Sequence, residues 1–144
     1  MLEAAVRGAR EEAVRRRLAP PKVLGVTVLT SVGSSACPAA GGASPAVRRR
    51  VIALALRAKQ AGLDCVIASA QEARAIRRRW GRGLIVCPGI RPAGAAAGDQ
   101  ARVASPAQAL ADGADWVVIG RPITEARRPR AAAQALMEEM ERSC

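Results

Sequence analysis

Short apolar runs alternate with longer amphipathic segments along this chain. Four of the runs are rich in β-branched residues, which is typical of strands that are buried on both faces. These runs are Val23 to Leu29, Cys65 to Ala68, Leu84 to Cys87, and Trp116 to Ile119. Because a helical pattern separates each run from the next, we expect an α/β fold with a parallel sheet.

Helical periodicity fills the segments around the strands. Ser44 and Ser105 each precede a proline, the order expected of an N-cap followed by the first helical residue. Gln108 stands at capping-box spacing from Ser105, and glycines at positions 62 and 81 act as stop signals. The predicted helices cover 1–18, 45–61, 71–80, 106–112 and 129–142, in the order α-β-α-β-α-β-α-β-α with right-handed crossovers.

One segment of the chain has a second copy. Residues 58–67 align with residues 109–118, and each copy contains a helix end, a glycine, an aspartate and a strand. Such a repeat is expected when one helix-to-strand unit recurs in a parallel fold. Both a barrel and a doubly wound sheet are compatible with it.

The 144 residues are half apolar and fit one domain, residues 1–144. The first segment lacks the apolar run of a signal peptide, and no window is long enough to span a membrane, so we expect a cytoplasmic protein. The four cysteines lie far apart, and the chain has no histidine to help bind zinc. We interpret the cysteines, at positions 37, 65, 87 and 144, as reduced structural thiols, because Cys65 and Cys87 fall in apolar runs.

The formal charge of +11 raises the possibility of a nucleic-acid partner. All but two of the 23 basic residues are arginine, and the triplets at 15–17, 48–50 and 77–79 lie on predicted helices. A solvated outer face explains such triplets. Because Trp80 and Trp116 are the only aromatic residues, stacking platforms for bases are also missing, and we disfavour nucleic acid as the partner.

Arginines follow the last two predicted strands. Arg91 comes after Cys87-Pro88-Gly89-Ile90, and Arg121 directly follows Gly120 at the end of the last strand. Loops at the carboxyl ends of the last two strands commonly hold phosphate in barrels, and a helix start adds backbone N–H donors. A guanidinium suits bidentate phosphate binding. The sequence therefore predicts a phosphate site formed by Arg91, Gly120 and Arg121.

Two further segments are poor in bulky side chains. Residues 32–43 consist mainly of Ser, Ala, Gly and Pro and are interpreted as a mobile loop. Residues 92–98 have almost no side chain to pack, so we interpret them as a lid. Gln100 follows this lid and is a candidate donor to a phosphate or a base.

These motifs together resemble the orotidine 5′-phosphate decarboxylases. In register, the resemblance covers nearly the whole chain except loop 32–43, which lacks an expected short helix. The matching segments are 26–31, 61–64, 69–73, 88–92, 97–100, 113–115 and 120–123.

The resemblance implies a TIM-barrel enzyme that removes CO₂ from orotidine 5′-monophosphate to give UMP in pyrimidine biosynthesis. It implies that no cofactor is needed and that the full-length family forms homodimers. Thr30 would contact the pyrimidine or ribose side of the nucleotide. Arg91, Gln100, Gly120 and Arg121 would hold the phosphate, with Gln100 bridging toward the base.

The family's Asp-x-Lys-x-x-Asp motif, whose lysine protonates the developing carbanion, is absent from these residues. The resemblance therefore assigns no catalytic residue here, and Met1 to Ala5 match the helix after the fourth strand of the barrel. We expect about half a barrel of four strands, with two unpaired edges and one uncovered apolar face. Such a chain is expected to be inactive alone and to self-associate or dissolve poorly.

Other functions stay open at this point. A non-catalytic nucleotide- or phosphate-binding half-barrel that works as an assembly partner would carry the same phosphate site. An arginine-rich nucleic-acid binder would bind with a steep salt dependence. Barrels that act on sugar phosphates are disfavoured by the spacing of Gly98-Asp99-Gln100 after residues 88–92.

Overall fold

The computed structural model describes residues 1–30, 44–92 and 102–142. In this part of the chain, four parallel strands form one sheet in the order β1-β2-β3-β4. This sequential order is that of a barrel segment, whereas a doubly wound sheet reverses its order at a switch point. The strands are β1 (Leu24–Val26), β2 (Cys65–Ile67), β3 (Leu84–Cys87) and β4 (Trp116–Val117).

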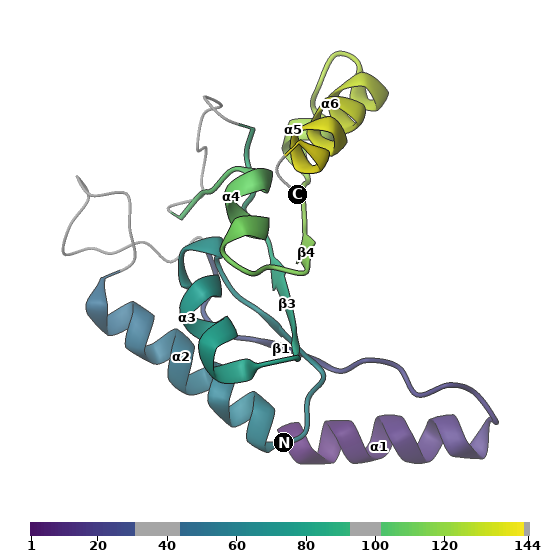
Figure 1. Ribbon diagram of the computed structural model, residues 1–144. Helices are drawn as coiled ribbons and strands as arrows, with labels where there is room; N and C mark the ends of the chain where they lie inside the picture. Colours follow the sequence, from purple (N-terminus) through teal and green to yellow (C-terminus); the bar gives the residue numbers. More distant parts are fainter. Residues whose placement is uncertain (31–43, 93–101, 143–144) are drawn as a thin grey trace.

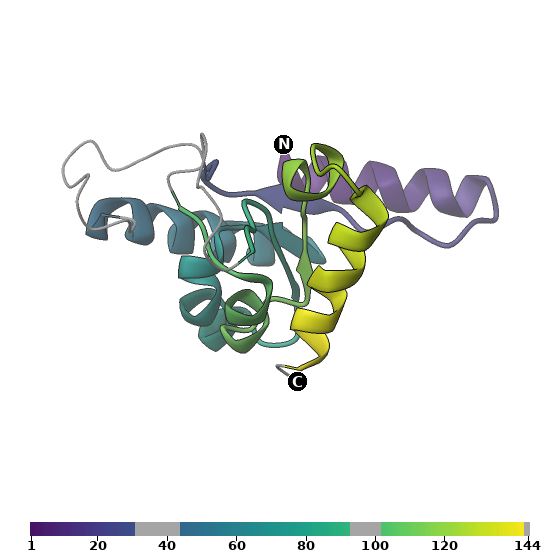
Figure 2. The same ribbon diagram turned by 90° about the horizontal axis from the view of Figure 1, so that it is seen from above.

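Six helices accompany the sheet in the described residues, and Figure 1 shows α2, α3 and α4 side by side on one face of it. Seen from above, α1 and α6 both lie on the right of the view, and α2 extends to the left (Figure 2). The helices are α1 (Leu2–Arg15), α2 (Pro45–Gln60), α3 (Ala70–Trp80), α4 (Pro106–Ala111), α5 (Arg121–Thr124) and α6 (Pro129–Glu141). Five of them were predicted, and α5 was not.

Serine side chains begin three of the helices. The hydroxyl of Ser44 accepts a hydrogen bond from the Val47 N–H at 3.2 Å, which confirms the predicted cap of α2. Ser105 accepts from the Gln108 N–H in the same way at 3.1 Å. The reciprocal bond of the expected capping box, from the Ser105 N–H to the Gln108 side-chain oxygen, is not among the hydrogen bonds of the described residues, and the Gln108 side-chain nitrogen donates to Asp112. Ser69, which the sequence analysis did not assign, caps α3.

Three predicted strands are shorter in the structure: β2 by one residue, and β1 and β4 by more. The Thr27 N–H still bonds to the Ile67 carbonyl, but the carbonyls of Val28 and Leu29 accept from the Arg102 guanidinium instead of a neighbouring strand. At the other edge, the Val118 N–H bonds to Cys87 before the chain turns into α5. The predicted β1 was therefore too long where Val28 and Leu29 bond to a side chain, and the predicted β4 was too long where the chain turns toward α5.

The main core lies between the sheet and its helices. Val66, Ile85 and Cys87 contribute the sheet side, and Val51 and Ile76 are among the helix residues that cover them. Close packing in this layer depends on one glycine in β1, Gly25. A Cβ atom added there would lie 2.8 Å from the Leu63 side chain and 3.3 Å from Ala58, so a larger residue would push α2 away from the strand.

The other face of the sheet is apolar and exposed at both edges. Val26, Ile67, Val86 and Trp116 share one register row, yet Val26 is 57% exposed and Trp116 is 59% exposed. Burial on both faces, predicted for all four strands, is therefore wrong for β1 and β4. The exposure is that of an open half-barrel, as expected. Within the described residues, β1 and β4 are the outer strands of the sheet, and no further strand lies beside either of them.

The second copy of the helix-to-strand unit has a structural explanation. A carboxylate oxygen of Asp64, just before β2, accepts a hydrogen bond from the Val23 N–H, just before β1, at 3.4 Å. Asp115, just before β4, accepts from the Ile85 N–H of β3 at 2.7 Å. In both copies, an aspartate at the start of one strand therefore binds the start of the strand before it.

Cys65 and Cys87 are free and buried, as predicted. Burial raises the pKa of both thiols, that of Cys87 to about 12, so the reactive thiolate is scarce near neutral pH. In a chain with Cys37 and Cys144 replaced by serine, we expect iodoacetamide to label neither thiol over an hour at about pH 8. Labelling in urea should be complete, and mass spectrometry reports both results. Fast labelling of the native chain would contradict the buried placement.

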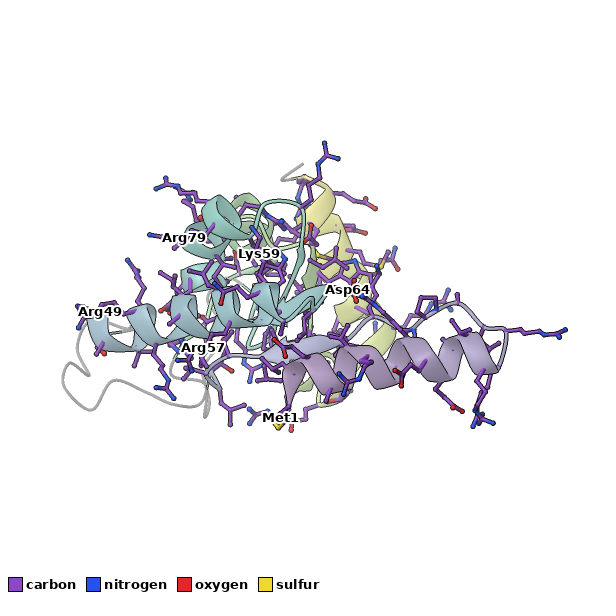
Figure 3. All side chains as sticks on the ribbon, turned by 90° about the horizontal axis from the view of Figure 1, so that it is seen from below. Met1, Arg49, Arg57, Lys59, Asp64 and Arg79 are labelled. Atoms are coloured by element: carbon purple, nitrogen blue, oxygen red, sulfur yellow. The ribbon has the colours of Figure 1, made fainter. Side chains whose placement is uncertain are left out.

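Basic side chains cover the outer helices. Figure 3 shows Arg49 and Arg57 along α2, and the Lys59 ammonium donates to the Arg79 carbonyl at 2.8 Å. Arg77 departs from the predicted solvated triplets, because it is half-buried and pairs with Asp115. Of the helices in 1–30, 44–92 and 102–142, none has both the length and the apolar character needed to cross a membrane.

Candidate functional site

Arg91 and Arg121 occupy matching positions beyond two neighbouring strands. Cys87 of β3 pairs in register with Val117 of β4, and each arginine lies four residues further along its own chain segment. Because the strands are parallel, both loops leave the sheet at its carboxyl edge. The structure thus brings the two predicted phosphate ligands to adjacent loops.

The backbone of Arg91 is held by a short parallel contact between residues 90–91 and Ala104. Its N–H donates to the Ala104 carbonyl at 3.0 Å, and Ile90, which is fully buried, forms an isolated parallel bridge with the same residue. Gly89 makes the preceding turn in the left-handed region at φ 74°. Among the described residues, the Arg91 guanidinium donates only to the carbonyl of the preceding residue, Ile90, at 3.3 Å. Its backbone is therefore fixed at the edge of the sheet.

Arg121 is the first residue of α5, directly after the exposed Gly120. The Gly120 carbonyl accepts from the N–H groups of Ile123 and Thr124, at 2.8 and 3.1 Å, so the turn that carries the arginine is closed. A Cβ atom added at Gly120 would meet no atom within 4 Å. The backbone at this point is thus open to close approach by a ligand.

Of the other two predicted site residues, Thr30 and Gln100, only Thr30 lies in the part of the chain that the structure describes. Thr30 lies just beyond β1 at the same carboxyl edge and is buried, with 8% of its surface exposed. Thr30 follows the first strand of the sheet, whereas Arg91 and Arg121 follow the third and fourth strands, and β2 lies between β1 and β3. Gln100, the lid interpretation of 92–98 and the mobile-loop interpretation of 32–43 fall wholly or mostly outside the described residues.

A buried ion pair at this edge was missed by the sequence analysis. The Arg102 guanidinium donates to a Glu72 carboxylate oxygen at 3.0 Å, and the exposed fractions of the two side chains are 1% and 0%. Burial raises the pKa of the Glu72 carboxyl, and the positive charge of Arg102 opposes part of that increase. In a chain so rich in arginine, neither residue stood out by type or spacing.

The charge at the edge favours an anion over a metal ion. Across the described ranges, no three His, Cys, Asp or Glu side chains gather where they could hold a metal. Two arginines on adjacent loops offer planar donor groups of the kind that bind phosphate oxygens. The arrangement is suited to binding a phosphate-bearing ligand.

Comparisons with known proteins agree with this geometry. Residues 1–136 match the model of the "Orotidine 5'-phosphate decarboxylase / HUMPS family". The orotidine 5′-phosphate decarboxylase of Moorella thermoacetica is 49% identical over 142 residues, covering 98% of this chain and 56% of that protein. The enzyme of the same name from Methylorubrum extorquens is 53% identical over 130 residues, covering 90% of this chain and 56% of that protein.

Solved structures show the same correspondence. The crystal structure of orotidine 5′-phosphate decarboxylase from Lactobacillus acidophilus superposes with a TM-score of 0.73 at 33% identity, covering 97% of this chain and 58% of the other. The chain thus spans a little over half the length of the relatives it matches. Its four parallel strands are about half of a TIM-barrel fold. The chain therefore belongs to the orotidine 5′-phosphate decarboxylase / HUMPS family.

Proposed function

We propose that this chain carries the phosphate- and base-binding half of an orotidine 5′-phosphate decarboxylase, with orotidine 5′-monophosphate and UMP as ligands. The observation that carries the proposal is the matched placement of Arg91 and Arg121 beyond paired residues of β3 and β4. The names and identity of the relatives support the choice of nucleotide.

The two guanidinium groups would bind the phosphate dianion from adjacent loops, and the open backbone at Gly120 would let an oxygen approach its N–H group. Gln100 would bridge between the phosphate and the base, and Thr30 would contact the pyrimidine or ribose side. In this role, the chain supplies binding energy far from the reacting carbon. Such energy can serve the reaction by orienting the base and stabilising the transition state.

The proton donor for decarboxylation would have to come from outside these residues. The chain has two lysines, Lys22 before β1 and Lys59 near the end of α2, and Lys59 binds the Arg79 carbonyl. Both precede a strand at its amino end, whereas the phosphate ligands follow strands at their carboxyl ends. We therefore expect no turnover of orotidine 5′-monophosphate by the 144 residues alone.

A complementation assay distinguishes an enzyme half from a non-catalytic assembly partner. The chain is mixed with the amino-terminal half of the Moorella thermoacetica decarboxylase, and loss of orotidine 5′-monophosphate is followed by absorbance. Restored turnover supports the decarboxylase proposal. UMP binding without any turnover would favour the assembly partner, and turnover by the chain alone would contradict the expected inactivity.

Replacing Arg121 with alanine is expected to weaken UMP binding by about 2 to 3 kcal/mol, because a charge-assisted pair of hydrogen bonds is lost. Isothermal titration calorimetry measures the change. Arg49→Ala is the matched control, since it removes the same charge from the outer face of α2 (Figure 3). Equal affinities of Arg121→Ala and the unaltered chain would remove Arg121 from the phosphate site.

A further inference from the structure

Three loops at the carboxyl edge of the sheet meet at one side chain, that of Arg102. Its guanidinium donates to the Val28 and Leu29 carbonyls, at 3.1 and 2.9 Å, just beyond β1. It also donates to Glu72, which lies in the first turn of the helix that follows β2. Arg102 thereby joins the ends of two neighbouring strands through its side chain alone.

The third loop is the one that carries Arg102 itself, the connection from β3 to α4, and its backbone returns to the end of β3. Two residues further on, the Ala104 carbonyl accepts the Arg91 N–H, and Ala104 forms the bridge with Ile90 beyond β3. Residues 102–104 therefore contact both the residue before Thr30 and the backbone of Arg91. Thr30 and Arg91 come from strands that are not neighbours, so this segment is a direct link between them across β2.

A contribution to the stability of the fold is a weak explanation for the buried Arg102–Glu72 ion pair. Burying two charges costs solvation energy that their attraction often fails to recover, and apolar residues of similar size are frequently as stable. The cost here is increased by two buried atoms without a hydrogen-bond partner in the described structure, one carboxylate oxygen of Glu72 and the Arg102 Nε. A specific geometry at the edge is a stronger reason, because only a planar guanidinium reaches two carbonyls and a carboxylate together.

We propose that Arg102 and Glu72 are positioning residues, whose buried ion pair fixes the ends of β1, β2 and β3 so that Thr30 and Arg91 face one ligand. The inference deepens the proposed function and rests on it for the identity of that ligand. Neither residue is assigned a contact with the nucleotide. They contribute by fixing the distance between Thr30 and Arg91, the residues that are proposed to contact the nucleotide.

The test uses Arg102→Lys, which keeps the charge but lacks the planar fork. Arg77→Lys is the matched control, because Arg77 also binds one carboxylate and several carbonyls, among them those of Gly83 and Gly113, at the amino edge of the sheet. UMP affinity and stoichiometry are measured by calorimetry. Backbone hydrogen exchange is measured by mass spectrometry on the same three proteins.

We expect Arg102→Lys to weaken UMP binding about tenfold or more at unchanged stoichiometry, since small displacements of positioning groups have large effects. Exchange should accelerate in residues 27–30 and 88–92. Arg77→Lys should accelerate exchange around 113–116 and leave the UMP dissociation constant unchanged. If Arg102→Lys does not fold, Glu72→Gln, which keeps the shape and one oxygen acceptor, is expected to show the same pattern.

A merely structural role would lower the stoichiometry in both variants without changing the dissociation constant, and that result would overturn the proposal. Unchanged exchange at 27–30 and 88–92 in Arg102→Lys would also overturn it. If the unaltered chain does not bind UMP, the proposed function fails for this chain by itself. The exchange comparison then still decides whether Arg102 holds the edge together.

Discussion

Replacing Trp80 with alanine is expected to lower the free energy of unfolding by about 3 to 5 kcal/mol, the range for removing a large buried aromatic side chain. Trp80 ends α3 and is 4% exposed. Its indole lies where a side chain at Gly83 would be, since a Cβ atom there would fall 1.0 Å from the indole nitrogen. The turn between α3 and β3 is thus built around this ring, and urea denaturation followed by circular dichroism measures the loss.

Trp116→Ala is the matched control for this prediction. Trp116 is the chain's other tryptophan and is 59% exposed on the open face of the sheet. Its removal should cost well under half as much, because little buried area is lost. Similar losses in the two variants would show that the open face is covered in solution or that α3 is not packed as described.

Replacing Glu72 with alanine is expected to destabilise the chain by about 3 to 5 kcal/mol, as for a buried ion pair broken from one side. The variant leaves the Arg102 guanidinium buried without its carboxylate, and only the carbonyls of Val28 and Leu29 remain as partners. The same denaturation experiment measures the change. Because domains of this size are stable by only about 5 to 15 kcal/mol, the variant is expected to be partly unfolded at 37 °C.

The double variant Glu72→Leu/Arg102→Met separates the cost of a broken pair from the value of an intact one. With both charges replaced by apolar groups, most of the lost stability should return. UMP binding should stay weak, because no group then joins Val28 to the first turn of α3. A double variant as unstable as Glu72→Ala would mean that the pair itself stabilises the fold.

Local signals were sufficient to predict five of the six described helices and the central strands. Pro45 after Ser44 and Pro106 after Ser105 begin helices for reasons that lie within a few residues, so the sequence pattern reveals them. The end of β1 depends on Arg102, more than 70 residues away, and no periodicity carries that information. Likewise, an apolar run predicts a strand but not whether a neighbour covers its outer face, as Trp116 shows.

The residues of the candidate site also fall into two groups, those that the sequence could predict and those that it could not. Arg91 and Arg121 could be predicted because a parallel sheet brings residues after neighbouring strands to one edge. Glu72 and Arg102 could not, since a charged pair within the fold has no motif of its own and five of the six described helices carry arginines. Its detection required the three-dimensional contact and the near-zero exposure of both side chains.

The carboxylates of Asp64 and Asp115 contact backbone N–H groups, which every residue type except proline supplies. Joints of this kind do not depend on which side chain stands at positions 23 and 85. When helix-and-strand modules from different relatives are recombined, these two joints therefore tolerate any side chain at positions 23 and 85 except proline, whereas the packing of Gly25 against Leu63 and the Arg77–Asp115 pair still have to be kept.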